Sequence, residues 1–200
     1  MRILGIDTSG KVAAAALYDS ESRCLLAQQT VYTKRTHSQV ILPLAERLLA
    51  DTGLNWQDVD GFAAAKGPGS YTGLRVGVST AKGLCFGAGI PMISVGTLDT
   101  LVWQALDGNM LPDGCRYIIP MIDARRMEVY TGIFTPDGKQ ISPTVAQIID
   151  ADSFKDQLAE GPVLFIGDDQ SQVGKGHPIG EQGVGAHHHV YGSGGHGVIN

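Results

Sequence analysis

The feature that most constrains the fold of this chain is an order of predicted elements that occurs twice. In the first half, apolar runs bounded by turn residues predict three strands, and their connections are so short that neighbours must run antiparallel. Apolar residues at three- and four-residue spacing then predict a helix, with Gly53 as its C-terminal cap, followed by a buried strand. These elements are expected at 2–7, 12–18, 24–31, 37–50 and 58–66.

The same order returns after the Pro/Gly-rich break at 109–114, once a second helix, a strand and a short third helix have been completed. Asp7 and Asp123 end the first strand of each set, so the sequence indicates an internal duplication with a period of about 115 residues. Such an order predicts an α/β protein with two mixed sheets flanked by helices. The remaining elements are expected at 72–87, 90–95, 97–106, 117–123, 128–134, 145–149, 153–158 and 163–167.

Three regions follow from this pattern: an N-terminal subdomain at 1–108, a second at 115–168, and an atypical tail at 169–200. The apolar periodicity stops after Gly167-Asp168, and residues 171–200 hold nine glycines and five histidines. So little apolar surface predicts a tail that is disordered, truncated or read in another frame. The second subdomain is therefore expected to be incomplete.

Composition places the chain among ordinary globular proteins, with 43% hydrophobic and 18% charged residues. No apolar stretch approaches the ~20 residues that cross a bilayer, and the opening MRILGIDTS has no signal-peptide pattern, so we expect a cytoplasmic protein without membrane contact. The net charge of −5 and the lack of a basic stripe predict that the chain does not bind nucleic acid alone. Its three cysteines, Cys24, Cys85 and Cys115, lack the spacing of a disulfide framework or a zinc site.

The sharpest local motif is the run GPGSYTGLRVG from Gly67 to Gly77. Glycines turn the chain after a strand, and Ser70 or Thr72 can cap a helix whose free N–H groups point back at the turn. Such a helix end suits an anion, although the spacing of a Walker A loop is absent. A tight turn with a capped helix and a phosphate contact are equally good interpretations.

Asp7, Thr8 and Ser9 follow the first strand, in a position that suits magnesium or phosphate. The same residues equally suit an Asx-turn that caps its own backbone. In the duplicate corner Asp123-Ala124-Arg125-Arg126, the arginines are more typical of a solvated face than of a ligand site.

Gly73, Gly77 and Ala81 lie four residues apart on one face of the second helix. Glycine inside a helix costs about 1 kcal/mol relative to alanine, so a close neighbour should compensate. That neighbour is either another part of this chain or a second subunit. In the second case, a bulky residue at Gly77 is expected to abolish partner binding and leave the fold largely intact.

Three segments resemble the TsaB (YeaZ) family: Ile3–Ser9, His37-Ser38 at the start of a Leu-rich helix, and the Gly67–Gly77 run. The resemblance covers residues 1–168 and implies the duplicated actin-like (ASKHA, ribonuclease H-like) fold. It also implies a non-catalytic scaffold or activator that binds the TsaD-type paralogue, which threonylcarbamoylates the adenosine next to the anticodon of tRNA. In that paralogue an H-x-x-x-H motif holds a metal. The matching positions here are Thr97 and Leu101, so no metal site and no catalytic residue are expected.

The resemblance further implies that the partner is contacted through the two N-terminal helices. It implies a TsaE-type ATPase as a further partner, leaves a homodimer open, and brings tRNA in only through the complex. No tightly bound cofactor is expected, although ATP or ADP at an interface with the partner is left open. The expected nucleotide-proximal residues are Asp7, Thr8, Ser9, Gly67, Gly69 and Ser70. The expected partner-binding residues are His37, Ile41, Leu44, Leu48, Gly73, Val76, Gly77, Thr80 and Ala81.

The alternative function is an ATP-using enzyme of the actin-like and sugar-kinase superfamily, with Asp7 near magnesium and Gly67–Ser70 near phosphate. Such an enzyme needs an intact glycine-rich turn after 163–167, where this chain has the acidic Asp168-Asp169 instead. A glycoprotease ranks last, because no nucleophile–base pair or metal motif stands out.

Overall fold

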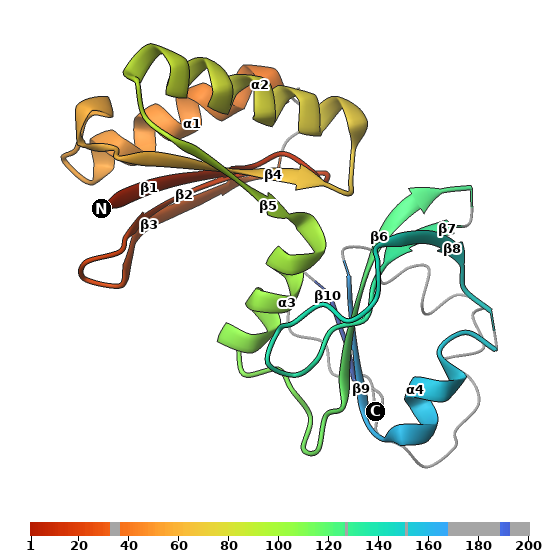
Figure 1. Cartoon of the computed structure of the whole chain (residues 1–200). Coiled ribbons are helices and arrows are strands. Elements are labelled where there is room, and N and C mark those ends of the chain that lie inside the picture. The colour runs from red at the N-terminus through yellow and green to blue at the C-terminus, as the bar shows by residue number, and fades with distance from the viewer. Residues whose placement is uncertain (33–36, 127, 151, 168–188, 193–200) are drawn as a thin grey trace. The chain divides into compact units, whose positions relative to one another are not determined.

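The computed structural model describes residues 1–32, 37–126, 128–150, 152–167 and 189–192 (Figure 1). Its internal contacts divide the chain into two units, Met1–Thr97 and Leu98–Asn200. The boundary therefore lies at residue 97 rather than at 108. The helix between these two positions belongs with the second unit, because its apolar residues are buried there.

The first unit is built on a five-stranded mixed sheet with the order β3-β2-β1-β4-β5. The hairpin strands β1, β2 and β3 are antiparallel neighbours, as the short connections predict. β4 and β5 run parallel to β1 and to β4, respectively. The strands are β1 (Arg2–Asp7), β2 (Ala13–Asp19), β3 (Cys24–Val31), β4 (Gly61–Gly67) and β5 (Met92–Gly96).

Two helices, α1 (His37–Asp51) and α2 (Tyr71–Ala88), cover the same face of this sheet (Figure 1). Leu4 and Phe62 point from the sheet toward Leu48 of α1 and Ala81 of α2, and all four are buried in one cluster. Right-handed β–α–β crossovers place successive helices on one face of a sheet, which explains this arrangement.

Strand β4 begins at Gly61, later than the predicted residue 58, because a short 3-10 helix, η1 (Trp56–Asp58), precedes it. The Asn55 N–H donates to Asp58 Oδ2 at 2.9 Å, and the Asp58 N–H donates to the Asn55 carbonyl at 3.0 Å. These reciprocal bonds turn the chain where an extended strand was expected.

The second unit repeats the strand order, as β10-β9-β6-β7-β8. Its strands are β6 (Tyr117–Arg125), β7 (Glu128–Thr131), β8 (Val145–Ile148), β9 (Val163–Gly167) and β10 (His189–Gly192). β7 is shorter than predicted, since Phe134 forms only isolated bridges, with Ile118 and Gln140.

Helix α3 (Thr97–Asp107) packs on one face of the second sheet, and α4 (Lys155–Glu160) on the other. Leu98, Val102 and Ala105 recur at helical spacing and are buried with residues of β6 and β9. This apolar face is the reason that α3 belongs to the second unit and not to the first.

The predicted duplication is confirmed by the matching strand orders, which give the duplicated actin-like fold. The two aspartates occupy equivalent corners. Asp7 Oδ1 accepts a hydrogen bond from the Ser9 N–H at 2.8 Å, and Asp123 Oδ1 accepts one from the Arg125 N–H at 2.7 Å. Both are Asx-turns, which for Asp7 is one of the two interpretations that the sequence left open.

Four residues of the tail predicted at 169–200 belong to the second sheet. Residues 189–192 form β10, which pairs parallel with β9. The remaining tail residues lie outside the described part of the chain. Among the described residues, no helix is both long enough and apolar enough to span a bilayer.

Candidate functional site

The residues predicted to lie near a nucleotide meet in one polar corner of the first unit. The Ser70 N–H donates to the Ser9 carbonyl at 2.7 Å, which joins the β4–α2 loop to the end of β1. Thr8 and Ser9 are buried there, and Thr8 Oγ1 donates to the Gly73 carbonyl at 2.7 Å. The corner therefore brings together Asp7, Thr8, Ser9, Gly67, Gly69 and Ser70.

Ser70 is the cap of α2, rather than Thr72. Its Oγ accepts a hydrogen bond from the Gly73 N–H at 3.2 Å, and its carbonyl accepts one from the Leu74 N–H at 2.8 Å. These bonds satisfy donors that the first turn of a helix would otherwise leave free. Contact of this helix end with phosphate stays a prediction.

The small-residue stripe of α2 packs against this same corner. A Cβ at Gly73 would lie 2.0 Å from the Thr8 carbonyl oxygen, and one at Gly77 would lie 2.4 Å from Thr8 Oγ1. Both distances are far below van der Waals contact, and Ala81 on the same stripe is also buried. The close neighbour of the stripe is thus internal. The expectation that a bulky residue at Gly77 would leave the fold largely intact is wrong.

Several other predicted partner-binding residues are also in the core. Ile41, Leu44 and Leu48 are buried against the first sheet, because the apolar stripe of an amphipathic helix covers its own sheet first. His37, Val76 and Thr80 are only partly exposed. A partner that docks on α1 and α2 must therefore contact mostly other residues.

The open surface of α2 carries two aromatic side chains that the sequence analysis did not select. Tyr71 is 75% exposed and Phe86 is 93% exposed. On α1, Leu42 is exposed as well. The exposure of Phe86 could have been predicted from its place in the sequence. Phe86 lies off the Gly73/Gly77/Ala81 stripe, so a helix that buries this stripe must present Phe86 to solvent.

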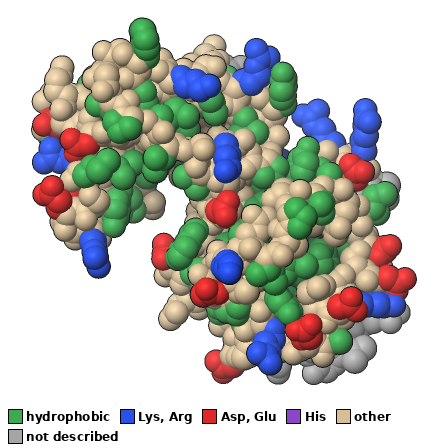
Figure 2. All heavy atoms as spheres, in the orientation of Figure 1, with side chains coloured by type: hydrophobic (Ala, Val, Ile, Leu, Met, Phe, Trp, Pro, Cys, Tyr) green, Lys and Arg blue, Asp and Glu red, His purple; other side chains and the backbone are tan. Residues whose placement is uncertain are grey.

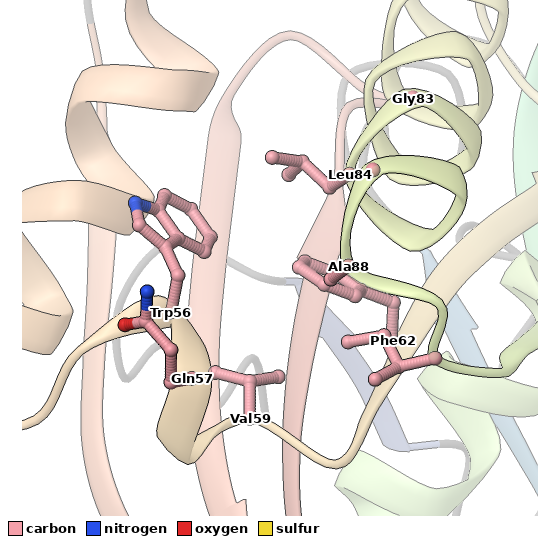
Figure 3. A pocket seen from close by; sticks show the side chains of 9 residues that line it. Trp56, Gln57, Val59, Phe62, Gly83, Leu84 and Ala88 are labelled. Atoms are coloured by element: carbon pink, nitrogen blue, oxygen red, sulfur yellow. The ribbon is translucent and has the colours of Figure 1, made fainter.

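A groove of about 590 Å³ lies between η1 and the C-terminal half of α2. Trp56 stands on one side and Leu84 and Ala88 on the other (Figure 3). The rings of Trp56 and Phe62 are stacked, with centroids 6.3 Å apart. The groove is lined by Trp56, Gln57, Val59, Phe62, Gly83, Leu84, Gly87, Ala88 and Ile90.

Two glycines of this groove differ from those of the stripe. A Cβ at Gly83 or Gly87 would meet no atom within 4 Å among the described residues. No contact among the described residues therefore requires glycine at these two positions.

The remaining candidates for chemistry are Thr97, a metal cluster and the cysteines. Thr97 is buried at the start of α3, and its Oγ1 has no hydrogen-bond partner among the described residues. Within the same residues, no group of three or more His, Cys, Asp or Glu side chains could hold a metal ion. Burial raises the pKa of the Cys85 and Cys115 thiols, which favours the unreactive thiol form.

Comparison with known proteins gives consistent matches. Residues 26–164 match the family model "TsaD: tRNA N6-adenosine threonylcarbamoyltransferase". The tRNA threonylcarbamoyladenosine biosynthesis protein TsaB of Bacillus subtilis is 38% identical over 174 residues, covering 86% of this chain and 72% of the relative. The protein of the same name from Escherichia coli is 36% identical over 137 residues, covering 68% of this chain and 56% of the relative.

A solved structure agrees. YeaZ from Pseudomonas aeruginosa has a TM-score of 0.69 at 25% identity, and the match covers 83% of this chain and 74% of that protein. The chain thus spans only part of its relatives, about half of the length in E. coli. The relatives named TsaB cover more of the chain than the TsaD-named relative from Syntrophobacter fumaroxidans, which covers 54%. The chain therefore belongs to the TsaB (YeaZ) family, a branch of the larger family that the TsaD model describes.

Proposed function

We propose that this chain acts in tRNA threonylcarbamoyladenosine biosynthesis as a non-catalytic subunit that binds and activates a TsaD-type paralogue. The pathway is supported by the printed names of relatives at 38% and 36% identity. The choice of partner is supported by the match of residues 26–164 to the TsaD model, which relates this chain to the transferase of the same pathway.

The observation that carries the proposal is the open face of α2. Phe86 exposes almost its entire ring, and another face of the same helix borders a groove lined by Trp56 and Leu84. Aromatic side chains dominate the energetics of protein interfaces, especially where a pocket adjoins them. An almost fully exposed aromatic ring on this helix is therefore a suitable anchor for a partner.

Gly83 and Gly87 also support a partner contact on α2. Gly83 and Gly87 each cost the helix about 1 kcal/mol relative to alanine. Gly73 and Gly77 are compensated by their contact with Thr8, whereas nothing within the described residues compensates Gly83 and Gly87. A partner helix that approaches the α2 backbone closely would provide the missing contact.

A non-catalytic role is supported by the residues at the two positions that correspond to the metal ligands of the paralogue. Thr97 and Leu101 replace the two histidines, and neither side chain is an imidazole ligand. The reaction itself would then belong to the partner, and tRNA would bind to the complex. A TsaE-type ATPase, and ATP or ADP at the interface, belong to the same proposal.

The test is a binding titration with the TsaD-type paralogue of the same organism, with light scattering to count subunits. We expect a one-to-one complex, and we expect Phe86→Ser to weaken it by at least about tenfold, as truncation of an interface hot spot does. The control is Ile148→Ser, which changes a side chain on β8 that is 59% exposed and should leave the affinity unchanged.

Full affinity of the Phe86→Ser variant would show that the partner docks elsewhere. Absence of any complex with a folded sample would refute the scaffold proposal. An ATPase assay on that sample would then test the enzyme alternative.

A further inference from the structure

We infer that the outer face of α2 recognises an acidic protein surface, with partner carboxylates opposite Arg75 and Lys82. The inference rests on the proposed function, because it specifies the chemistry of the partner that docks there. It adds a charge requirement to a contact described so far only through its apolar groups.

The charge pattern of α2 is unlike that of the chain as a whole. The chain carries 20 acidic and 15 basic residues, for a net charge of −5. The 18 residues of α2, YTGLRVGVSTAKGLCFGA, include Arg75 and Lys82 and no acidic residue. In Figure 2 the upper edge of the first unit, where α2 lies in the same orientation in Figure 1, shows blue and green side chains and no red ones.

The two cations lie on the same helix face as the exposed aromatic residues. Tyr71, Arg75, Ser79, Lys82 and Phe86 follow one another at steps of four, four, three and four residues, and all five are exposed. Arg75 and Lys82 are separated by two helical turns, or about 10 Å along the axis. The Arg75 guanidinium lies 5.4 Å from the centre of the Tyr71 ring, a cation–π contact that directs it along this face.

Within the described part of the chain, neither cation has a carboxylate within ion-pair distance. A partner that covers Phe86 must also cover or adjoin these two groups, because they lie on the same face of α2. Taking an unpaired cation out of water is costly, so a tight complex requires the partner to supply opposite charges at that spacing.

A second copy of this chain fits the face less well. A two-fold contact uses the same patch on both copies, so the carboxylates opposite Arg75 and Lys82 would have to come from this same patch. The outer charges of the neighbouring α1 are mixed, and Arg47 Nε lies 3.7 Å from an Asp51 carboxylate oxygen. The acidic residues of α1 are Glu46 and Asp51, and among the described residues only Glu46 has no ion-pair partner. A second copy would therefore offer one unpaired carboxylate of α1 to the two cations.

RNA also fits poorly. Affinity for a nucleic acid grows with the number of phosphates neutralised, and two cations supply few such contacts. A protein surface that combines apolar side chains with carboxylates matches the whole face.

The experiment compares Arg75→Glu/Lys82→Glu with the control Arg126→Glu/Lys139→Glu, in titrations against the TsaD-type paralogue at several salt concentrations. Both pairs consist of exposed residues, and each substitution shifts the net charge by the same amount. We expect the α2 variant to lose about tenfold or more in affinity near 0.1 M salt, mostly through slower association. The control should stay within about twofold of the wild type.

The salt dependence separates charge recognition from damage to the helix. At about 1 M salt the screening length falls to about 3 Å, so the difference between the α2 variant and the wild type should largely disappear. A loss that persists at high salt, an equal loss in the control, or no loss at all would overturn the inference.

Two further outcomes identify other occupants. If the α2 variant loses self-association, or if the isolated chain binds tRNA and the variant does not, the face belongs to a second copy or to RNA, and the inference is overturned. If Phe86→Ser weakens the complex and charge reversal does not, the inference fails while the proposed function stands.

Discussion

Replacing Gly77 by alanine should destabilise the first unit, although alanine is the better helix former. The difference in helix propensity alone would make the Gly77→Ala variant more stable by about 1 kcal/mol. Against it, the new Cβ would lie 2.4 Å from Thr8 Oγ1, a buried hydroxyl that donates to the Gly73 carbonyl. Displacing this hydroxyl leaves a buried donor unsatisfied, at about 1–3 kcal/mol, and overpacking adds about 1–3 kcal/mol. We therefore expect a net loss of about 1–5 kcal/mol.

The matched control is Gly83→Ala on the same helix. Nothing within the described residues lies within 4 Å of a Cβ at this position, so only the difference in helix propensity acts. We expect this variant to be more stable than the wild type by up to about 1 kcal/mol. The two substitutions are chemically identical and should have opposite signs.

The assay is urea unfolding followed by tryptophan fluorescence. The chain has two tryptophans, Trp56 in the first unit and Trp103 in the second. A Trp103→Phe background leaves Trp56 as the reporter of the unit that is perturbed. In this background, Thr8→Ala should restore part of the stability lost by Gly77→Ala, because it removes the oxygen that the new Cβ meets. Equal stability of the Gly77→Ala and Gly83→Ala variants would refute the reasoning.

Two further predictions concern titrating groups. The Asn55 N–H holds the pKa of the Asp58 carboxyl below its ordinary value. The stabilisation by Asp58 is therefore complete above pH about 4 and is lost as the pH falls through the folded pKa. Asp58→Ala should lower the urea midpoint at pH about 6 and have a smaller effect at pH about 2.5; an equal effect at both pH values would contradict this. In thiol labelling of the folded chain, exposed Cys24 should react at least about tenfold faster than buried Cys85, whose thiol pKa is raised by burial, and similar rates would contradict the assignment.

Local signals in the sequence predicted most elements of both sheets. Strands β1, β3 and β9 have the predicted bounds, because each is an apolar run closed by turn residues. Ser70 as a cap and the left-handed Gly53 after α1 also follow from local chemistry. The start of β4 was missed, since the reciprocal bonds of Asn55 and Asp58 compete with strand formation at that point.

Contacts between distant residues were not predictable in the same way. The sequence shows that α2 has a small-residue face, but not that Thr8, 65 positions away from Gly73, fills it. Nor does an amphipathic pattern say which sheet a helix will cover, which is why α3 was assigned to the first half. The buried residues of α1 were chosen as partner contacts for the same reason: a stripe that covers its own sheet and a stripe that covers a partner have the same period.

The junction between β5 and α3 has a consequence for dividing this protein. The strand ends at Gly96 and the helix begins at Thr97, so no linker separates the two units along the chain. A fragment that ended at residue 108 would carry Leu98, Val102 and Ala105 without the sheet that buries them. An exposed apolar helix of this kind promotes aggregation. Any gene fragment meant to yield the first unit alone should therefore stop at the strand, before this helix begins.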